Sequence, residues 1–251
     1  MTDLLSDIQC FLTTERELFG ETLLSDDRHS AKEAAMPSRQ QPAVEQPMLF
    51  EPPPAGKVPM TTEPWGDART VDELNAGICR CQKCPLGATR TNFVFGVGNP
   101  HATLMVIGEA PGADEDAQGE PFVGRAGQLL NKILEAINFK REDVYICNIL
   151  KCRPPENRKP QSEEVGQCIP YLRKQIELVK PRLILCLGLT AAENLLNTTE
   201  SLGKLRGRVM KYEGIPLMVT YHPAALLRNP NWKRPAWEDV QAARKLHDEL
   251  V

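Results

Sequence analysis

The chain has 251 residues, of which 41 % are hydrophobic and 25 % charged, and its 30 Lys and Arg against 33 Asp and Glu give a formal net charge of −3. No apolar run approaches the ~18–20 residues of a membrane span, and no basic segment precedes an apolar core at the N-terminus. We therefore expect a cytoplasmic protein, neither membrane-bound nor secreted, whose eight cysteines are reduced thiols or metal ligands.

The charge is divided unevenly along the chain. Residues 1–65 contain 5 basic and 11 acidic side chains (−6), whereas residues 66–251 contain 25 basic and 22 acidic ones (+3). The net charge of −3 argues against a nucleic-acid-binding protein, but the net charge of +3 on residues 66–251 does not. The division predicts an N-terminal extension over residues 1–65 and a folded domain over residues 66–251.

The extension combines an amphipathic segment with a proline-rich one. Apolar residues at helical spacing predict one helix over about residues 3–24, which packs on its own domain, on another copy or on a partner. Eight prolines between residues 37 and 64 predict a disordered linker over about residues 25–65. In this linker Gln46, Leu49 and Phe50 resemble the Gln-x-x-Leu-Phe peptides with which bacterial repair and replication proteins bind the sliding clamp, although chance also explains so short a match.

The remainder alternates short β-rich runs with helical patterns. We expect strands at residues 103–108, 143–150, 182–187 and 215–221, and helices at about 125–137, 162–179, 190–196 and 235–250. Ser162, followed by two glutamates, is typical of a helix N-cap. This order predicts a three-layer α/β/α sandwich with a central, mainly parallel four-stranded sheet, in which ligands bind beyond the carboxyl ends of the strands.

Polar residues follow three of these strands. The first is followed by Glu109 in a Gly- and Pro-containing turn over residues 108–112, whose backbone amides can approach a ligand closely. Asn148, at the end of the second strand, offers both a donor and an acceptor, and His222 follows the fourth strand. An isolated histidine is more often structural, but a histidine, an amide and a carboxylate at strand carboxyl ends favour a functional site.

The cysteines form a second constellation. Cys81 and Cys84 make a Cys-x-x-Cys motif before the sheet, and Cys152 and Cys168 flank the loop after the second strand. Four thiolates from two segments fit a tetrahedral zinc ion or an iron–sulfur cluster, and the spacing does not decide between them. Cys79 competes with Cys81 as a ligand. Two further cysteines lie inside expected strands and should be small buried apolar residues: Cys147 and Cys186.

Basic residues surround the second cysteine pair. Lys151, Arg153, Arg158 and Lys159 flank the segment Pro-Pro-Glu-Asn at residues 154–157. A solvated charged loop and a phosphate-binding loop both fit this pattern.

The chain from about residue 70 to 250 resembles the type 4, iron–sulfur branch of the uracil-DNA glycosylase superfamily. The resemblance is carried by GEAPGADED from residue 108, GEPFVGRAGQLL from 119, YICNILKCRPPENR from 145 and HPAALLRN from 222, with the cysteine spacing. It covers nothing before about residue 66. It implies a 4Fe-4S cluster on Cys81, Cys84, Cys152 and Cys168, and base excision repair in a bacterial, nucleoid-associated setting.

The resemblance also implies a reaction and roles for single residues. The N-glycosidic bond of deoxyuridine would be hydrolysed in single- or double-stranded DNA, after the base flips out, leaving an abasic site. Phe122 would stack on the uracil, Asn148 would read its polar edge, and His222 would donate a hydrogen bond to O2 as charge develops on the leaving base. The implied DNA contacts are a wedge in the gap left by the base, from Leu226 or Leu227, and phosphate contacts from Arg228, Arg153 and Arg158.

Two positions depart from the best-known branch of that superfamily. Ala110 stands where that branch has a water-positioning aspartate, so Glu109 is the first candidate for this role and Glu115 the second. Gly112 stands where that branch has a bulky aromatic that excludes the thymine methyl, so discrimination against thymine must come from elsewhere.

The sequence leaves three competing functions open. A related branch traps the abasic site covalently through a histidine in a basic insertion, but residues 203–208 here contain no histidine. A second alternative is an iron–sulfur DNA-binding protein without turnover, whose pocket would be vestigial, and the intact set Glu109, Phe122, Asn148 and His222 argues against it. A third, suggested by the N-terminal extension, is a replication-associated scaffold in which catalysis is secondary. We expect a monomeric domain, whose cluster is structural or redox-sensing.

Overall fold

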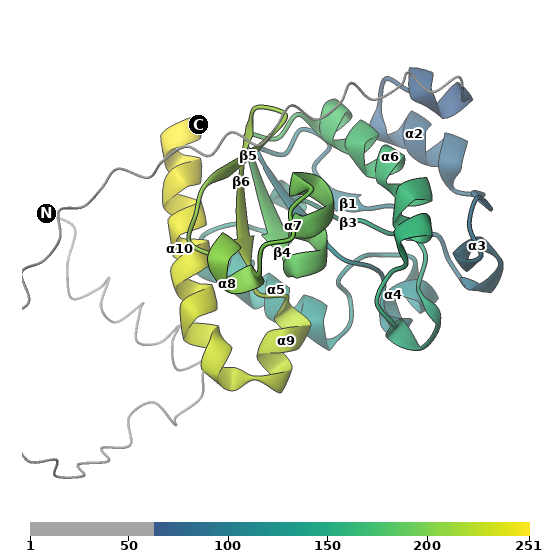
Figure 1. Ribbon diagram of the computed structural model, residues 1–251. Helices are drawn as coiled ribbons and strands as arrows, with labels where there is room; N and C mark the ends of the chain where they lie inside the picture. Colours follow the sequence, from purple (N-terminus) through teal and green to yellow (C-terminus); the bar gives the residue numbers. More distant parts are fainter. Residues whose placement is uncertain (1–62) are drawn as a thin grey trace, which may run out of the picture. The chain divides into compact units, whose positions relative to one another are not determined.

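The computed structural model describes residues 63–251 (Figure 1). The predicted N-terminal helix, the proline-rich linker and the sequence from Gln46 to Phe50 lie outside the described residues. The division of the chain into an extension and a domain therefore stays a prediction.

The described domain is built on one six-stranded sheet with the strand order β1-β3-β2-β4-β6-β5 (Figure 1). The strands are β1 (Val97–Gly98), β2 (Leu104–Gly108), β3 (Tyr145–Asn148), β4 (Leu183–Leu187), β5 (Met210–Tyr212) and β6 (Ile215–Thr220). The four central strands are parallel and are the four that the sequence predicts. The count of four is wrong because two edge strands pair antiparallel, β1 with β3 and β5 with β6. With two and three residues, they are too short to carry an alternating pattern.

Helices cover both faces of the sheet. The helices are α2 (Val71–Ile78), α3 (Leu86–Thr89), α4 (Ala113–Gln118), α5 (Arg125–Ala136), α6 (Ser162–Val179), α7 (Leu189–Leu196), α8 (Leu202–Leu205), α9 (Pro223–Arg228) and α10 (Lys233–Leu250). The four predicted helices correspond to α5, α6, α7 and α10, with ends within two residues. The other five helices were not predicted. The three-layer α/β/α sandwich is confirmed.

Alternate strand residues face the two helical layers. On β2, Met105 and Ile107 belong to one core cluster with residues of α2, α6 and α7, such as Leu74, Leu172 and Ala191. Their neighbours on β2 are also buried but point to the other face, which α5 and α10 cover (Figure 1). Burial on both faces explains why the parallel strands are continuously apolar in sequence.

The N-cap of α6 differs from the prediction by one residue. Ser162 is the first helical residue, and Gln161 is the N-cap. The carboxylate of Glu164 accepts the backbone N–H of Gln161 at 2.8 Å, so an acid of the first turn, not the serine hydroxyl, satisfies the helix start.

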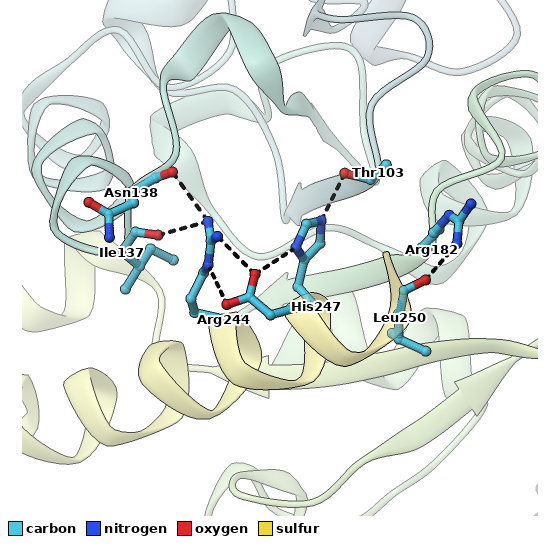
Figure 2. Close-up of polar contacts among 8 residues, drawn as sticks. Thr103, Ile137, Asn138, Arg182, Arg244, His247 and Leu250 are labelled. Atoms are coloured by element: carbon cyan, nitrogen blue, oxygen red, sulfur yellow. Dashed lines mark hydrogen bonds and ion pairs between the residues drawn. The ribbon is translucent and has the colours of Figure 1, made fainter. Parts of the chain in front are cut away.

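The end of α10 is fixed to the sheet and to the end of α5 (Figure 2). His247 Nε2 lies 2.8 Å from the Thr103 hydroxyl, just before β2. Arg244 donates to the backbone carbonyls of Ile137 and Asn138 at 3.3 and 3.2 Å. These contacts hold the C-terminal helix across a sheet whose strands come from distant parts of the chain. In residues 63–251 no helix is both long and apolar enough to span a bilayer.

Candidate active site

A cavity of about 480 Å³ opens at the carboxyl ends of the parallel strands. Its walls come from the segments that follow β2, β3, β4 and β6. The chain adds β3 on one side of β2 and β4 on the other, and such a switch point is where ligands bind in open α/β sheets. All seven residues predicted to catalyse or to contact the base line it: Glu109, Ala110, Gly112, Glu115, Phe122, Asn148 and His222.

Phe122 is held in an unusual backbone conformation at the cavity wall. Its φ of 55° is in the left-handed region, which bulky side chains rarely adopt, and its side chain is buried. Arg141 donates to the carbonyls of Phe122 and Pro121 at 3.2 and 2.5 Å. Gly127 lets the helix behind it approach, because a Cβ there would lie 1.8 Å from the Phe122 carbonyl oxygen. Strain of this kind persists where the surroundings over-determine it, as at functional sites.

Asn148 ends β3 with its amide aimed at the cavity. The residue is only 2 % exposed, and among the described residues its Oδ1 has no hydrogen-bond partner. A buried acceptor without a donor costs roughly 1–3 kcal/mol. Gly108 gives it room, since a Cβ at that position would lie 2.4 Å from Oδ1. The site therefore presents an acceptor that a ligand N–H would satisfy.

His222 is the N-cap of α9, and this position fixes its protonation. Its Nδ1 accepts the backbone N–H of Ala224 at 3.2 Å, so the ring proton is on Nε2. Burial, and then the charge of Arg228, lowers the pKa of His222 to about 4. The ring centroid lies 5.5 Å from that of Phe122. At neutral pH the cavity thus contains an uncharged imidazole with one N–H to donate.

The two glutamates of the turn have different surroundings. Glu115 accepts three backbone N–H groups at 3.0 Å, from Gly112, Val123 and Gly124. Its carboxylate ties the turn after β2 to the segment that carries Phe122, which does not favour it as a water-positioning group. Glu109 is half-buried and also lines the cavity, so it remains the candidate.

Lys151 does not belong to a basic surface, and this part of the prediction is wrong. The residue is fully buried, and its ammonium donates to the Asn148 carbonyl at 2.8 Å and to Gln175 Oε1 at 2.5 Å. Burial lowers the pKa of Lys151. A run of charged residues in sequence does not reveal that one of them follows a buried strand and turns inward.

The predicted DNA-contacting residues are placed unequally. Arg158 and Arg228 line the cavity. The two terminal nitrogens of the Arg158 guanidinium donate to the Glu164 carboxylate, at 2.9 and 2.5 Å, while Arg153 donates to Asn157 Oδ1 at 2.8 Å. On α9 the two leucines differ: one is 2 % exposed (Leu226) and the other 40 % (Leu227). The buried leucine cannot enter DNA from this conformation.

The four cysteines of the second constellation line one small pocket: Cys81, Cys84, Cys152 and Cys168. Cys79 does not line it. Among residues 63–251, no three Cys, His, Asp or Glu side chains converge closely enough to hold a single metal ion. Two strand cysteines are fully buried as predicted: Cys147 and Cys186.

Three of the four sulfur atoms receive hydrogen bonds. Arg90 donates to Cys152 Sγ at 3.2 Å, the Lys151 backbone N–H to Cys168 Sγ at 3.3 Å, and the Tyr171 hydroxyl to Cys81 Sγ at 3.2 Å. Burial raises the pKa of the Cys168 thiol to about 12, so a thiolate there needs donors and a cation to stabilise it. Sequence reasoning missed Arg90, Tyr171 and Arg141, which no motif marks because they act through contacts distant in sequence.

Comparison with known proteins gives one consistent family. The model of the uracil DNA glycosylase superfamily matches residues 95–241 of the chain. A type-4 uracil-DNA glycosylase of Archaeoglobus fulgidus is 43 % identical over 185 residues, 70 % of this chain and 93 % of the relative. Proteins with the same name from Pyrobaculum aerophilum and Thermotoga maritima are 46 % and 43 % identical, over 64 % and 66 % of this chain and 86 % and 88 % of the relatives.

Proposed function

Because this chain belongs to the uracil-DNA glycosylase superfamily, we infer that it excises uracil from DNA by hydrolysing the N-glycosidic bond, which leaves an abasic site for base excision repair. The observation that carries this function is the buried Asn148 Oδ1, which has no hydrogen-bond partner within residues 63–251 and lies in one cavity with a neutral histidine. The target base must leave the DNA stack to enter, at a cost of a few kcal/mol that is smallest for mispaired or single-stranded uracil.

Asn148 supplies the means to select uracil. Its Oδ1 would accept the N3–H of the base, and its amide N–H₂ would donate to O4. Cytosine has the reverse pattern on this edge, with an acceptor at N3 and a donor at C4. Cytosine would leave the buried Oδ1 unpaired, at roughly the cost of an unsatisfied buried acceptor.

His222 supplies electrostatic stabilisation of the leaving base. As the glycosidic bond breaks, negative charge develops on the uracil, and the Nε2–H of His222 would donate to O2. A preorganised donor of this kind contributes on the order of 10²–10³ in rate. The backbone bond at Nδ1 orients the ring before the substrate arrives.

The remaining residues complete the site. The Phe122 ring would stack on the base, and the turn through Ala110 and Gly112 would close over it, held by Glu115. Glu109 would position the attacking water and stabilise the cationic sugar. Since the sugar resembles an oxocarbenium ion and the uracil leaves as a stabilised anion, a strong general base is unnecessary.

Exposed and half-buried residues near the cavity would bind the DNA. Leu227 would fill the gap that the flipped base leaves, because Leu226 is buried. Arg228, Arg158 and Arg153 would contact phosphates. A protein with this substrate works where the DNA is, which in a bacterium is the nucleoid.

The four-cysteine pocket would hold a 4Fe-4S cluster. The fit rests on the donor set: four thiols around one pocket, with N–H and O–H donors to three of the sulfurs. When bound, the cluster supplies a rigid covalent link, and it is able to exchange an electron. Cys81 and Cys84 would then tie the segment before the sheet to the loop between Cys152 and Cys168, beside Arg153 and Arg158.

Uracil release from an oligonucleotide under single-turnover conditions tests this function. We expect His222→Ala and Asn148→Ala each to reduce the rate at least tenfold, since each removes a group that touches the base. His101→Ala, at an exposed histidine outside the cavity, is the matched control and should keep the wild-type rate.

The same experiment separates uracil excision from the competing functions. Wild-type rates in both cavity variants would overturn the site assignment. DNA binding without any release would indicate a non-catalytic binding protein, and a protein band shifted on denaturing gels would indicate covalent trapping of the abasic site.

We further propose that the extension binds a bacterial sliding clamp through Gln46, Leu49 and Phe50. The sequence supports this, because a tethered peptide can place two large apolar anchors in a preformed groove. A peptide of residues 44–53 should bind a clamp in calorimetry, and the same peptide with Leu49 and Phe50 replaced by alanine should not. Absence of binding by the unaltered peptide would contradict the proposal.

A further inference from the structure

An exposed aromatic pair borders the proposed uracil cavity. Tyr221 and Trp232 both line the cavity, and their rings stack with centroids 5.0 Å apart and planes within 17°. Trp232 is 40 % exposed, whereas the two other described tryptophans, Trp65 and Trp237, are 7 % and 8 % exposed. An indole ring with one face on Tyr221 leaves part of its surface open beside the cavity.

The pair is braced from the protein side. The guanidinium carbon of Arg206 lies 4.5 Å from the Tyr221 ring centroid. Arg206 is itself fixed by two hydrogen bonds to Asp239, at 2.7 and 3.0 Å, and by one to the Pro235 carbonyl at 2.5 Å. Tyr221 directly precedes His222 in the chain, so the same backbone positions the catalytic imidazole and the aromatic pair. A ring that is already ordered loses little conformational entropy when a ligand stacks on it.

The surroundings of Trp232 suit a nucleic acid. Arg228 lines the same cavity, and Leu227, the proposed wedge, is exposed on the helix that precedes the Trp232 segment Pro230–Trp232. Arg234, two residues further on, is largely exposed and lies 3.5 Å from Glu238. An exposed aromatic ring beside basic side chains is how proteins bind single-stranded nucleic acid, because every base has a face that can stack.

We propose that Trp232 is a stacking platform for the nucleobase next to the flipped uridine in single-stranded DNA. This subsite rests on the proposed uracil-excision function and specifies its substrate further, as uracil in single-stranded DNA with a base beside it. In a duplex the neighbouring base is held by pairing with the opposite strand, by stacking on its other neighbour and by the wedge in the gap, so the platform acts mainly on single-stranded substrate. Because stacking reads the face of the base and not its edge, the subsite tolerates all four bases, with purines stacking over the larger area.

The kinetic test uses Trp232→Ala, Trp232→Phe and a control, Val209→Ala, at another residue that is 40 % exposed. We expect Trp232→Ala to raise KM for a single-stranded uracil oligonucleotide by roughly 5- to 100-fold, with kcat nearly unchanged. Trp232→Phe should restore most of the affinity. An oligonucleotide in which both neighbours of the uridine lack bases should abolish the difference between wild type and Trp232→Ala.

A second measurement does not depend on turnover. Since Trp65 and Trp237 are buried, quenching of tryptophan fluorescence by single-stranded DNA reports on Trp232. Single-stranded DNA should quench the tryptophan fluorescence of the wild-type protein. The quenching should be much weaker with the oligonucleotide that lacks the flanking bases, and much weaker in Trp232→Phe. Quenching without uracil release would refute the proposed uracil excision but not the stacking of a nucleobase on Trp232. Two results would overturn the platform alone. One is uracil release with the same KM in wild type and Trp232→Ala; the other is a rise in KM of Trp232→Ala that is as large on the oligonucleotide without flanking bases as on the intact one.

Discussion

Replacing Gly108 by alanine tests the geometry of the uracil site with the smallest possible change. Gly108 ends β2, and a Cβ there would lie 2.4 Å from Asn148 Oδ1 and 2.5 Å from Phe122 Cζ. Ordinary van der Waals contact begins at 3.4 Å, so both side chains must withdraw by about 1 Å. Misplacement of a substrate-positioning group by 1 Å costs on the order of 10²-fold in rate, and overpacking a tight core costs roughly 1–3 kcal/mol of stability.

Single-turnover uracil excision and urea denaturation measure the two effects. We expect Gly108→Ala to slow excision by about two orders of magnitude. Gly166→Ala is the matched control, because Gly166 lies inside α6 and a Cβ there meets nothing within 4 Å. This control should excise uracil normally and gain about 0.5–1 kcal/mol, since alanine favours a helix. If Gly108→Ala has the wild-type rate and stability, Asn148 and Phe122 are not positioned as the structure has them, and the assignment of the base site fails.

Three further predictions concern protonation, burial and the wedge. Because the pKa of His222 is lowered to about 4 in the folded chain, the excision rate should show no histidine inflection near pH 6.5. The free energy of unfolding should fall as the pH drops from about 6.5 to 4, because the histidine of the unfolded chain takes up a proton in this range before that of the folded chain. A rate inflection near pH 6.5 that disappears in His222→Asn would contradict this. Lys151→Met leaves the Asn148 carbonyl and Gln175 Oε1 without their donor, so the free energy of unfolding should fall by roughly 2–4 kcal/mol, and an unchanged urea midpoint would refute the buried bond. Leu226→Ala should lower the free energy of unfolding by about 2–5 kcal/mol, because this leucine is buried. Leu227→Ala should leave the free energy of unfolding unchanged and slow uracil excision from duplex DNA. The reverse result would make Leu226 the wedge and Leu227 the core residue.

The parallel strands and long helices were predictable because their sequence patterns are local. Continuous apolar runs mark β2, β3, β4 and β6, and a 3.6-residue period marks α6, whose observed range Ser162–Val179 is the predicted one. The two-residue β1 and the three-residue β5 carry no pattern of their own. They are strands only because the edges of β3 and β6 offer partners for their backbone groups.

The candidate site followed from one topological rule and from motifs. Polar residues after parallel strands gather at one edge of the sheet, so the sequence alone predicts that Glu109, Asn148 and His222 lie together, and all three line the cavity. Their chemistry could not be predicted in full. The protonation of His222 depends on the local turn at the start of α9, which brings the Ala224 N–H to Nδ1, and on burial by residues distant in sequence, and the residue types alone give neither.

By itself the sequence determined the α/β/α class, the seven residues predicted to catalyse or to contact the base, all of which line the cavity, and the four cysteines that share a pocket. Only the tertiary structure decided which side chains are free to act. Leu226 and Leu227 are adjacent in sequence, yet α9 buries the first and exposes the second. Lys151 has the charge of a surface residue but lies in the core, and Trp232 has the bulk of a core residue but lies open beside the cavity. The physical reason is that composition and spacing report average burial, whereas solvent access, pKa and hydrogen-bond satisfaction depend on atoms brought together from distant parts of the chain.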